Sequence, residues 1–336
     1  MLSHRRNGRN LARVDRRSRL REDAIRLMPM RASKDYAYPP FALMSRVFDL
    51  GQWSEPQQVY ERLGADTKSA LLRLLPPDWS FQGRRVLDFG CGAGRTLRHF
   101  LAEAEEWEFW GADIDRPSIE WMQDVLSPPL HVWKSAHGPP LGLEPGSFDL
   151  IWAISVFTHL PQTSSLQWLL ELHRLLKPGG FLIATYSGRW NSAYFEGEEW
   201  DDDRIGMNVL QNALTWEQGG PSVLMSDWWV RAHWGRAFEI VSELRRFHNF
   251  TWVLMKKREV ELTPEDLERP EDDPREHAAL RHNIRQVQRE VDYLTAQLAA
   301  IEGAVRQEYE GSLSWRLTKP LRGARLALRR RGSSLE

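Results

Sequence analysis

The sequence predicts an α/β protein with a doubly wound sheet of seven strands, an inserted aromatic-rich region and a C-terminal coiled-coil helix. Between residues 85 and 186, short apolar runs alternate with amphipathic stretches, an order typical of parallel strands covered by helices on both faces. A glycine-rich turn follows the first of these runs. Near the C-terminus, eight apolar residues recur at heptad spacing, which indicates a coiled coil.

The composition narrows the class of protein. The 336 residues are 42% hydrophobic and 27% charged, which excludes a wholly disordered, collagen-like or disulfide-stapled chain. Cys91 is the only cysteine, so an internal disulfide and a cysteine-rich zinc site are excluded too. No run approaches the ~18 apolar residues of a membrane span, and the Arg-rich N-terminus lacks the apolar core of a signal peptide. We therefore expect a cytoplasmic protein.

The formal net charge of −1 hides an acidic body with two basic ends. Residues 1–31 carry ten Arg and three acidic residues, and residues 311–336 carry seven Lys or Arg and one Glu. Residues 32–310 keep 28 basic and 42 acidic residues. Basic ends favour an anionic partner, either a phospholipid surface or nucleic acid, although a solvated basic tail is an equal alternative.

The elements follow in chain order. Residues 1–35 are expected to be a disordered basic arm, and the domain after it spans 36–258, with a first helix over 65–75 that ends before two prolines. The expected strands are 85–89, 107–113, 130–134, 148–154, 181–186, 238–244 and 250–255. Further helices are expected over 94–105, 117–126 and 162–176.

Residues 187–236 form a long insertion between the fifth and sixth expected strands. Its aromatic residues are Trp190, Tyr194, Phe195, Trp200, Trp216, Trp228, Trp229 and Trp234. Indole faces pack well against sugar C–H surfaces, but we expect at least half of these residues to form the insertion's own core. The acidic run over 198–203 is interpreted as a solvated loop, and no metal site is expected.

The C-terminal third changes character twice. Residues 259–276 are dense in Glu, Asp and Pro and are expected to be an acidic linker; residues 277–310 are the expected coiled coil. Its seam residues are Leu280, Ile284, Val287, Val291, Leu294, Leu298, Ile301 and Val305. A two-stranded seam makes a homodimer, while a helix of another protein and folding back on the domain stay open. Residues 311–336 form a basic amphipathic tail, for peripheral contact with the inner membrane face or for disorder.

A glycine-rich stretch is the strongest indication of a binding site. Residues 86–94 run from an expected strand through Gly90 and Gly92 to Gly94, where a helix is expected to begin. Glycines allow a sharp turn and a close ligand approach, and a helix N-terminus offers N–H donors. Asp113 ends the next strand nineteen residues beyond Gly94, and in a doubly wound sheet such an acid reaches a ribose. The combination predicts a site for an adenosine-containing cofactor.

Four motifs resemble those of the class I S-adenosylmethionine-dependent methyltransferases. They are the loop 88–94, Gly-Ala-Asp-Ile-Asp at 111–115, Gly-Ser-Phe-Asp-Leu-Ile-Trp at 146–152 and Leu-Lys-Pro-Gly-Gly-Phe-Leu at 176–182. The resemblance covers 84–186 and implies a Rossmann-like fold and S-adenosyl-L-methionine as cofactor.

The same resemblance implies roles for individual residues. It assigns Asp88, Gly90 and Gly92 to the methionine end of the cofactor, Asp113 to the ribose hydroxyls and Ile114 to the adenine. Gly94, at the end of the same loop, is also expected to bind the cofactor. Many relatives carry an acid after the third strand that contacts the adenine amino group. Here residues 134–138 read Lys-Ser-Ala-His-Gly, so that contact is in doubt.

Two histidines are candidates for catalysis. His159 falls where the fourth strand gives way to its helix, and an imidazole there can take the proton of an acceptor hydroxyl, with a structural role as the equal alternative. His233 is the weaker candidate.

The acceptor is inferred from the features outside these motifs. The aromatic insertion, the basic ends and the similarity of 312–322 to tails of enzymes that build bacterial cell-surface glycans point to O-methylation of a sugar hydroxyl in a glycan or its precursor. Rival interpretations are a small quinone or polyketide acceptor and a non-catalytic, cofactor-binding coiled-coil scaffold. A nucleic-acid acceptor is disfavoured, because residues 153–156 lack the Asn/Asp-Pro-Pro-aromatic signature of amino-directed enzymes.

Overall fold

The computed structural model describes residues 36–46, 54–190, 200–210 and 220–312, together with 314, 315, 317, 318 and 320. The basic arm expected over 1–35 and residues 321–336 of the expected tail lie outside this part of the chain. The chain divides into two compact units, Met1–His282 and Asn283–Glu336.

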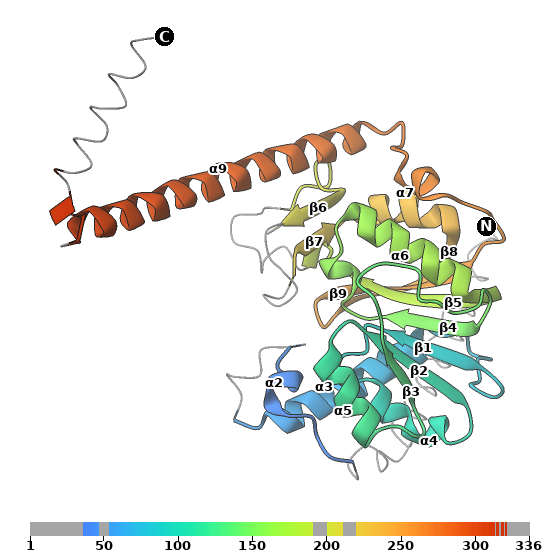
Figure 1. Ribbon diagram of the computed structural model, residues 1–336. Helices are drawn as coiled ribbons and strands as arrows, with labels where there is room; N and C mark the ends of the chain where they lie inside the picture. The colour runs from blue at the N-terminus through green and yellow to red at the C-terminus, as the bar shows by residue number, and fades with distance from the viewer. Residues whose placement is uncertain are drawn as a thin grey trace. The chain divides into compact units, whose positions relative to one another are not determined.

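A seven-stranded sheet forms the centre of the first unit (Figure 1). Its strands are β1 (Arg85–Phe89), β2 (Glu108–Asp113), β3 (His131–Lys134), β4 (Phe148–Ala153), β5 (Leu176–Tyr186), β8 (Phe238–Phe247) and β9 (Phe250–Lys257). Their order is β3-β2-β1-β4-β5-β9-β8; β9 runs antiparallel to both neighbours, and the first five strands are parallel. The predicted doubly wound sheet of seven strands is confirmed.

Helices cover both faces of this sheet (Figure 1). In chain order the helical segments are α2 (Phe41–Met44), α3 (Pro56–Leu74), η2 (Leu97–Phe100), α4 (Leu101–Ala104), α5 (Arg116–Val125), η3 (Phe157–His159), α6 (Gln162–Leu175), α7 (Asp227–Ala237), α8 (Pro264–Glu268) and α9 (Pro274–Gly311). Successive strand residues alternate between two cores: Val86 packs with α3, η2 and α5, whereas Leu87 packs with α6 and α7. Because both faces are covered, the strands read as continuous apolar runs.

The start of the helix expected over 94–105 is wrong. Residues 92–96 form turns, η2 is a single 3-10 segment, and α4 is one turn long. Gly94 has a φ of +76°, outside the helical region, and a Cβ added there would lie 2.9 Å from Met122 Cε of α5. Close packing of the loop on α5 therefore requires a turn at Gly94 and leaves no helix N-terminus there.

The expected acidic linker contributes to the core of the first unit. Within 259–276, α8 begins with a capping box between Thr263 and Asp266. Leu267 is 0% exposed and belongs to the core cluster that α6 and α7 share. The unit accordingly extends to His282, beyond the expected boundary at 258.

The insertion 187–236 contributes a small second sheet and a helix. Strands β6 (Met207–Leu210) and β7 (Ser222–Met225) pair antiparallel, and α7 follows them. Trp229 and Trp234 are buried in the core, as expected for part of the aromatic set. Tyr194, Phe195 and Trp216 lie outside the described residues. Among the helices described, none is long and apolar enough to cross a membrane.

Replacing Leu267 by Ala is expected to lower the free energy of unfolding by about 2–5 kcal/mol, because it leaves a cavity in the core. Urea denaturation of the full chain measures the change. The control Glu261→Ala, at an exposed position of the same segment, is expected to stay within about 0.5 kcal/mol of wild type. Equal stability of Leu267→Ala and wild type would mean that this segment is a linker after all.

Candidate functional site

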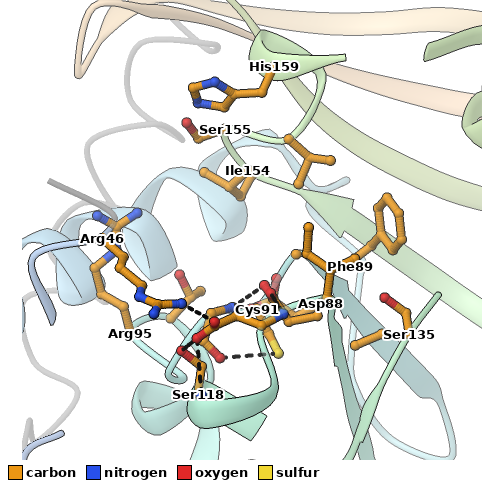
Figure 2. Close-up of a pocket in the computed structure, with 18 of the residues that line it drawn as sticks. Arg46, Asp88, Phe89, Cys91, Arg95, Ser118, Ser135, Ile154, Ser155 and His159 are labelled. Atoms are coloured by element: carbon orange, nitrogen blue, oxygen red, sulfur yellow. Dashed lines mark hydrogen bonds and ion pairs between the residues drawn. The ribbon is translucent and has the colours of Figure 1, made fainter. Parts of the chain in front are cut away.

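A cavity of about 610 Å³ lies at the carboxyl ends of β1, β2 and β4 (Figure 2). This volume is in the range of small-molecule sites. The predicted site residues that line it are Asp88, Gly90, Gly92, Asp113, Ile114 and His159. β1 lies between β2 and β4, so the loops after β1 and β4 separate here, which is where ligands bind in open α/β sheets.

The glycine loop folds back over the end of β2. Gly90 has a φ of +82°, and its N–H donates to the carbonyl of Ala112 at 2.8 Å. A Cβ added at Gly90 would lie 2.3 Å from Val156 Cγ2, so only glycine fits at this position. Gly94, which was predicted to bind the cofactor, packs against α5 and is not among the residues that line the cavity.

Two backbone N–H groups hold the carboxylate of Asp113. Gly92 N donates to Oδ2 at 2.7 Å, and Asp115 N donates to Oδ1 at 2.8 Å. Each oxygen keeps a second lone pair for a further donor. Burial raises the pKa of Asp113, which the backbone donors oppose. The result is a fixed pair of acceptors on the cavity wall.

Asp88 is a buried acid, with only 3% of its surface exposed. Burial raises the pKa of Asp88 to about 7; the nearby Trp152 indole and the Arg95 guanidinium lower it, and the charge of Asp113 raises it. A carboxyl group in this state is expensive to ionise without a cation. A cationic ligand group beside Asp88 would therefore be bound strongly.

His159 lies at one end of the cavity, with Cys91 and Ser118 toward the other (Figure 2). Its Nδ1 is 2.9 Å from the carbonyl oxygen of Pro221. Because a carbonyl only accepts, Nδ1 carries the proton, and Nε2 is the acceptor nitrogen of the neutral ring. Burial lowers the pKa of His159, so the neutral form prevails at pH 7.

His233, the weaker catalytic candidate, lies away from the cavity. Its side chain is 0% exposed and stacks on Trp229, with ring centroids 4.3 Å apart. Nδ1 lies 2.7 Å from the carbonyl oxygen of Leu267, and Nε2 lies 3.1 Å from Glu276 Oε2. His233 thus fastens α8 and the start of α9 to α7, which is a structural role.

Several residues of the cavity were not predicted from the sequence. Arg46, Arg95, Ser135, His137 and Ser155 line it together with the predicted residues. Arg95 follows the glycine loop directly, which was a usable signal, whereas Arg46 comes from a distant segment and had none. Ser155 has a φ of +61°, rare for a residue other than glycine, and its N–H donates to Thr185 Oγ1 at 2.7 Å. Such strain is typical of functional sites.

The insertion's aromatic residues do not form the cavity wall in the described part of the chain. Trp228 donates its indole N–H to the Ile205 carbonyl, Trp200 donates to Asp202, and Arg246 stacks on Trp190. The indole at the cavity comes from α6 instead: Trp168 lies with its ring centroid 4.7 Å from that of Phe89. The expectation that the insertion presents a sugar platform therefore lacks support from its described indoles.

Two residues of the acidic run, Asp201 and Asp202, are each paired with an arginine. Asp201 contacts Arg204, and Asp202 contacts Arg189. Across the residues that the structure describes, no group of three or more His, Cys, Asp or Glu could hold a metal ion.

Comparison with known proteins identifies the kind of domain. Residues 87–182 match a methyltransferase domain family. The chain is 30% identical over 159 residues to the 2-methyl-6-phytyl-1,4-hydroquinone methyltransferase of Synechocystis sp., covering 47% of this chain and 42% of that protein. It is 29% identical over 205 residues to a tRNA U34 carboxymethyltransferase of Idiomarina loihiensis, covering 56% of this chain and 58% of that protein.

A solved structure of an S-adenosylmethionine-dependent methyltransferase from Mesorhizobium loti aligns with a TM-score of 0.44 at 16% identity, covering 56% of this chain and 96% of that one. The chain spans roughly half the length of the hydroquinone methyltransferase and of the tRNA carboxymethyltransferase that it matches.

The pKa of Asp88 makes stability depend on pH. The folded state holds this proton up to about pH 7, whereas an unfolded Asp loses it near pH 4, so stability falls as pH rises between these values. Asp88→Asn removes the penalty and is expected to raise the free energy of unfolding by up to about 4 kcal/mol at pH 8. Near pH 4 the two proteins should be alike. Urea denaturation at both pH values measures this, and a variant that is less stable than wild type at pH 8 would contradict it.

Proposed function

We propose that this chain, which carries a class I S-adenosylmethionine-dependent methyltransferase domain over residues 87–182, transfers the methyl group of S-adenosyl-L-methionine to a hydroxyl of its acceptor. The proposal rests on the observation that Asp88, Asp113 and His159 line one cavity. When bound, the cofactor supplies a methyl group already activated on a sulfonium. The protein has to bind the cofactor, align the acceptor and take its proton.

The polar groups of the cavity fit this cofactor. Asp88 would accept from the ammonium of the methionine end, whose charge offsets the cost of ionising a buried acid. The remaining lone pairs of Asp113 would accept from the ribose hydroxyls, and Ile114 would pack on the adenine. Arg95, which lines the same cavity, would pair with the methionine carboxylate.

His159 would act as the general base. Its neutral ring presents Nε2 as the acceptor nitrogen, because the Pro221 carbonyl keeps the proton on Nδ1. After the acceptor's proton moves to Nε2, the imidazolium keeps its hydrogen bond to that carbonyl, which favours the charged ring.

For the acceptor we propose a sugar hydroxyl of a cell-surface glycan or its precursor. The excess of acidic residues over 32–310 disfavours a polyanionic acceptor such as RNA. The hydroquinone methyltransferase among the relatives keeps a phenolic small molecule as the rival acceptor class. A panel of sugar nucleotides, a hydroquinone and a short RNA, each with radiolabelled cofactor, separates the three, and binding without transfer to any of them favours the scaffold.

The cofactor site is tested by calorimetry with S-adenosylhomocysteine. Asp113→Ala is expected to weaken binding by at least tenfold, because two charge-assisted hydrogen bonds to the ribose are lost. Asp124→Ala, which removes an exposed acid from α5, is the matched control and should bind like wild type. Unchanged affinity in Asp113→Ala would refute the ribose assignment.

The base is tested by the pH profile of methyl transfer. The rate for wild type should rise with pH to a plateau, with its midpoint below the ordinary pKa of an imidazole, since burial lowers the pKa of His159. His159→Gln should lose this limb and about 10²–10⁴-fold in rate, while its affinity for S-adenosylhomocysteine stays unchanged. His131→Gln, outside the cavity on β3, is the control. Full turnover by His159→Gln would remove the residue from the mechanism.

A further inference from the structure

An exposed apolar seam runs along α9 in the second unit. Seven of its residues are 46–69% exposed: Ile284, Val287, Val291, Leu294, Leu298, Ile301 and Val305. They alternate at spacings of three and four, so they occupy the a and d positions of three heptads and, at Val305, the a position of a fourth. A continuous stripe of this kind needs a partner helix, because single scattered apolar residues are common but a stripe is not.

The apolar residues of two copies of this helix face each other in register when the two helices run antiparallel. With a at Ile284, Val291 and Leu298 and d at Val287, Leu294 and Ile301, each a residue can face a d residue of a second copy. The three layers, each of which occurs twice, are Ile284 with Ile301, Val287 with Leu298, and Val291 with Leu294. They extend over about 27 Å of helix, and each layer combines two aliphatic side chains of similar volume.

The charges beside the seam favour the same alignment. Arg281 and Glu302 both occupy e positions and are exposed. In antiparallel coils, e residues face e residues, so this alignment sets Arg281 against Glu302 of the second copy twice. The g positions bring Glu290 opposite Gln297, so no like charges meet.

The parallel alignment lacks this complement. There g residues face e residues of the next heptad, which sets Arg281 against Glu276. Glu276 is 2% exposed, with Oε2 3.1 Å from His233 Nε2 in its own chain, and is therefore engaged inside the first unit. The remaining facing pairs, such as Glu290 with Thr295 and Gln297 with Glu302, contain no opposite charges.

We propose that α9 pairs with α9 of a second copy of this chain as an antiparallel coiled coil, whose two-fold axis passes between Asp292 and Tyr293. This interface goes beyond the proposed methyl transfer and does not depend on it. We infer a second copy as the partner because the same antiparallel alignment pairs both the apolar residues and the opposite charges of two identical helices.

Sedimentation equilibrium of the full chain tests the proposal with charge-swapped variants. Arg281→Glu and Glu302→Arg should each weaken dimerisation about five- to tenfold, because two attractive pairs become repulsive. An equimolar mixture of the two variants should dimerise like wild type, since each pair is then attractive again. The double variant should recover as well.

Outward-facing positions provide matched controls. Arg289→Glu and Glu310→Arg make the same charge changes at f positions and should dimerise like wild type. A circular dichroism spectrum equal to that of wild type shows that each variant is folded.

Cysteine cross-linking reports the direction. A mixture of Ile284→Cys and Ile301→Cys chains should form a disulfide-linked dimer, whereas neither variant should cross-link alone, since identical positions lie about 25 Å apart. The native Cys91 is buried and common to all samples. Cross-linking of either variant alone, dimers without rescue in the mixture, or a monomeric wild-type chain would each overturn the proposal.

Discussion

The reversal of direction at β1 is the constraint on which the site depends. The chain builds β2 and β3 on one side of β1 and then crosses to build β4 and β5 on the other. The loops after β1 and β4 consequently separate, and helices cannot close the gap between them. Gly90 and Gly92 of the glycine loop, Asp113 at the end of β2 and His159 of η3 come from three different parts of the chain, yet all line the cavity that this reversal creates.

Two features of the polar cavity lower the stability of the folded state. Asp88 is buried with a pKa raised to about 7, and Ser155 holds a left-handed backbone conformation at the cavity wall. The two large apolar cores on the faces of the sheet offset the cost of the buried acid and of the strained backbone. The cationic end of the proposed cofactor would relieve the first of these costs on binding.

Local pattern and short-range stereochemistry predicted much of this arrangement. Buried parallel strands are recognisable as apolar runs in the sequence. The glycine loop is recognisable because positive φ angles favour glycine, and Asp113 because it is an acid at the end of an apolar run. The helix at Gly94 was mispredicted because its packing partner, Met122, lies on a later helix. Arg46 lines the cavity but lies in a segment that carries no motif. The burial of Leu267 was not predicted because the surrounding segment 259–276 is rich in acidic residues. Non-local contacts decided each of these cases.

A crystal structure of the chain with S-adenosylhomocysteine would decide whether the cavity at the ends of β1 and β2 is the cofactor site. We expect the ribose hydroxyls within about 3.2 Å of the Asp113 carboxylate, the ammonium beside Asp88 and the adenine against Ile114. A ligand bound elsewhere, or one in this cavity with Asp88 and Asp113 turned away from it, would refute the proposed cofactor site.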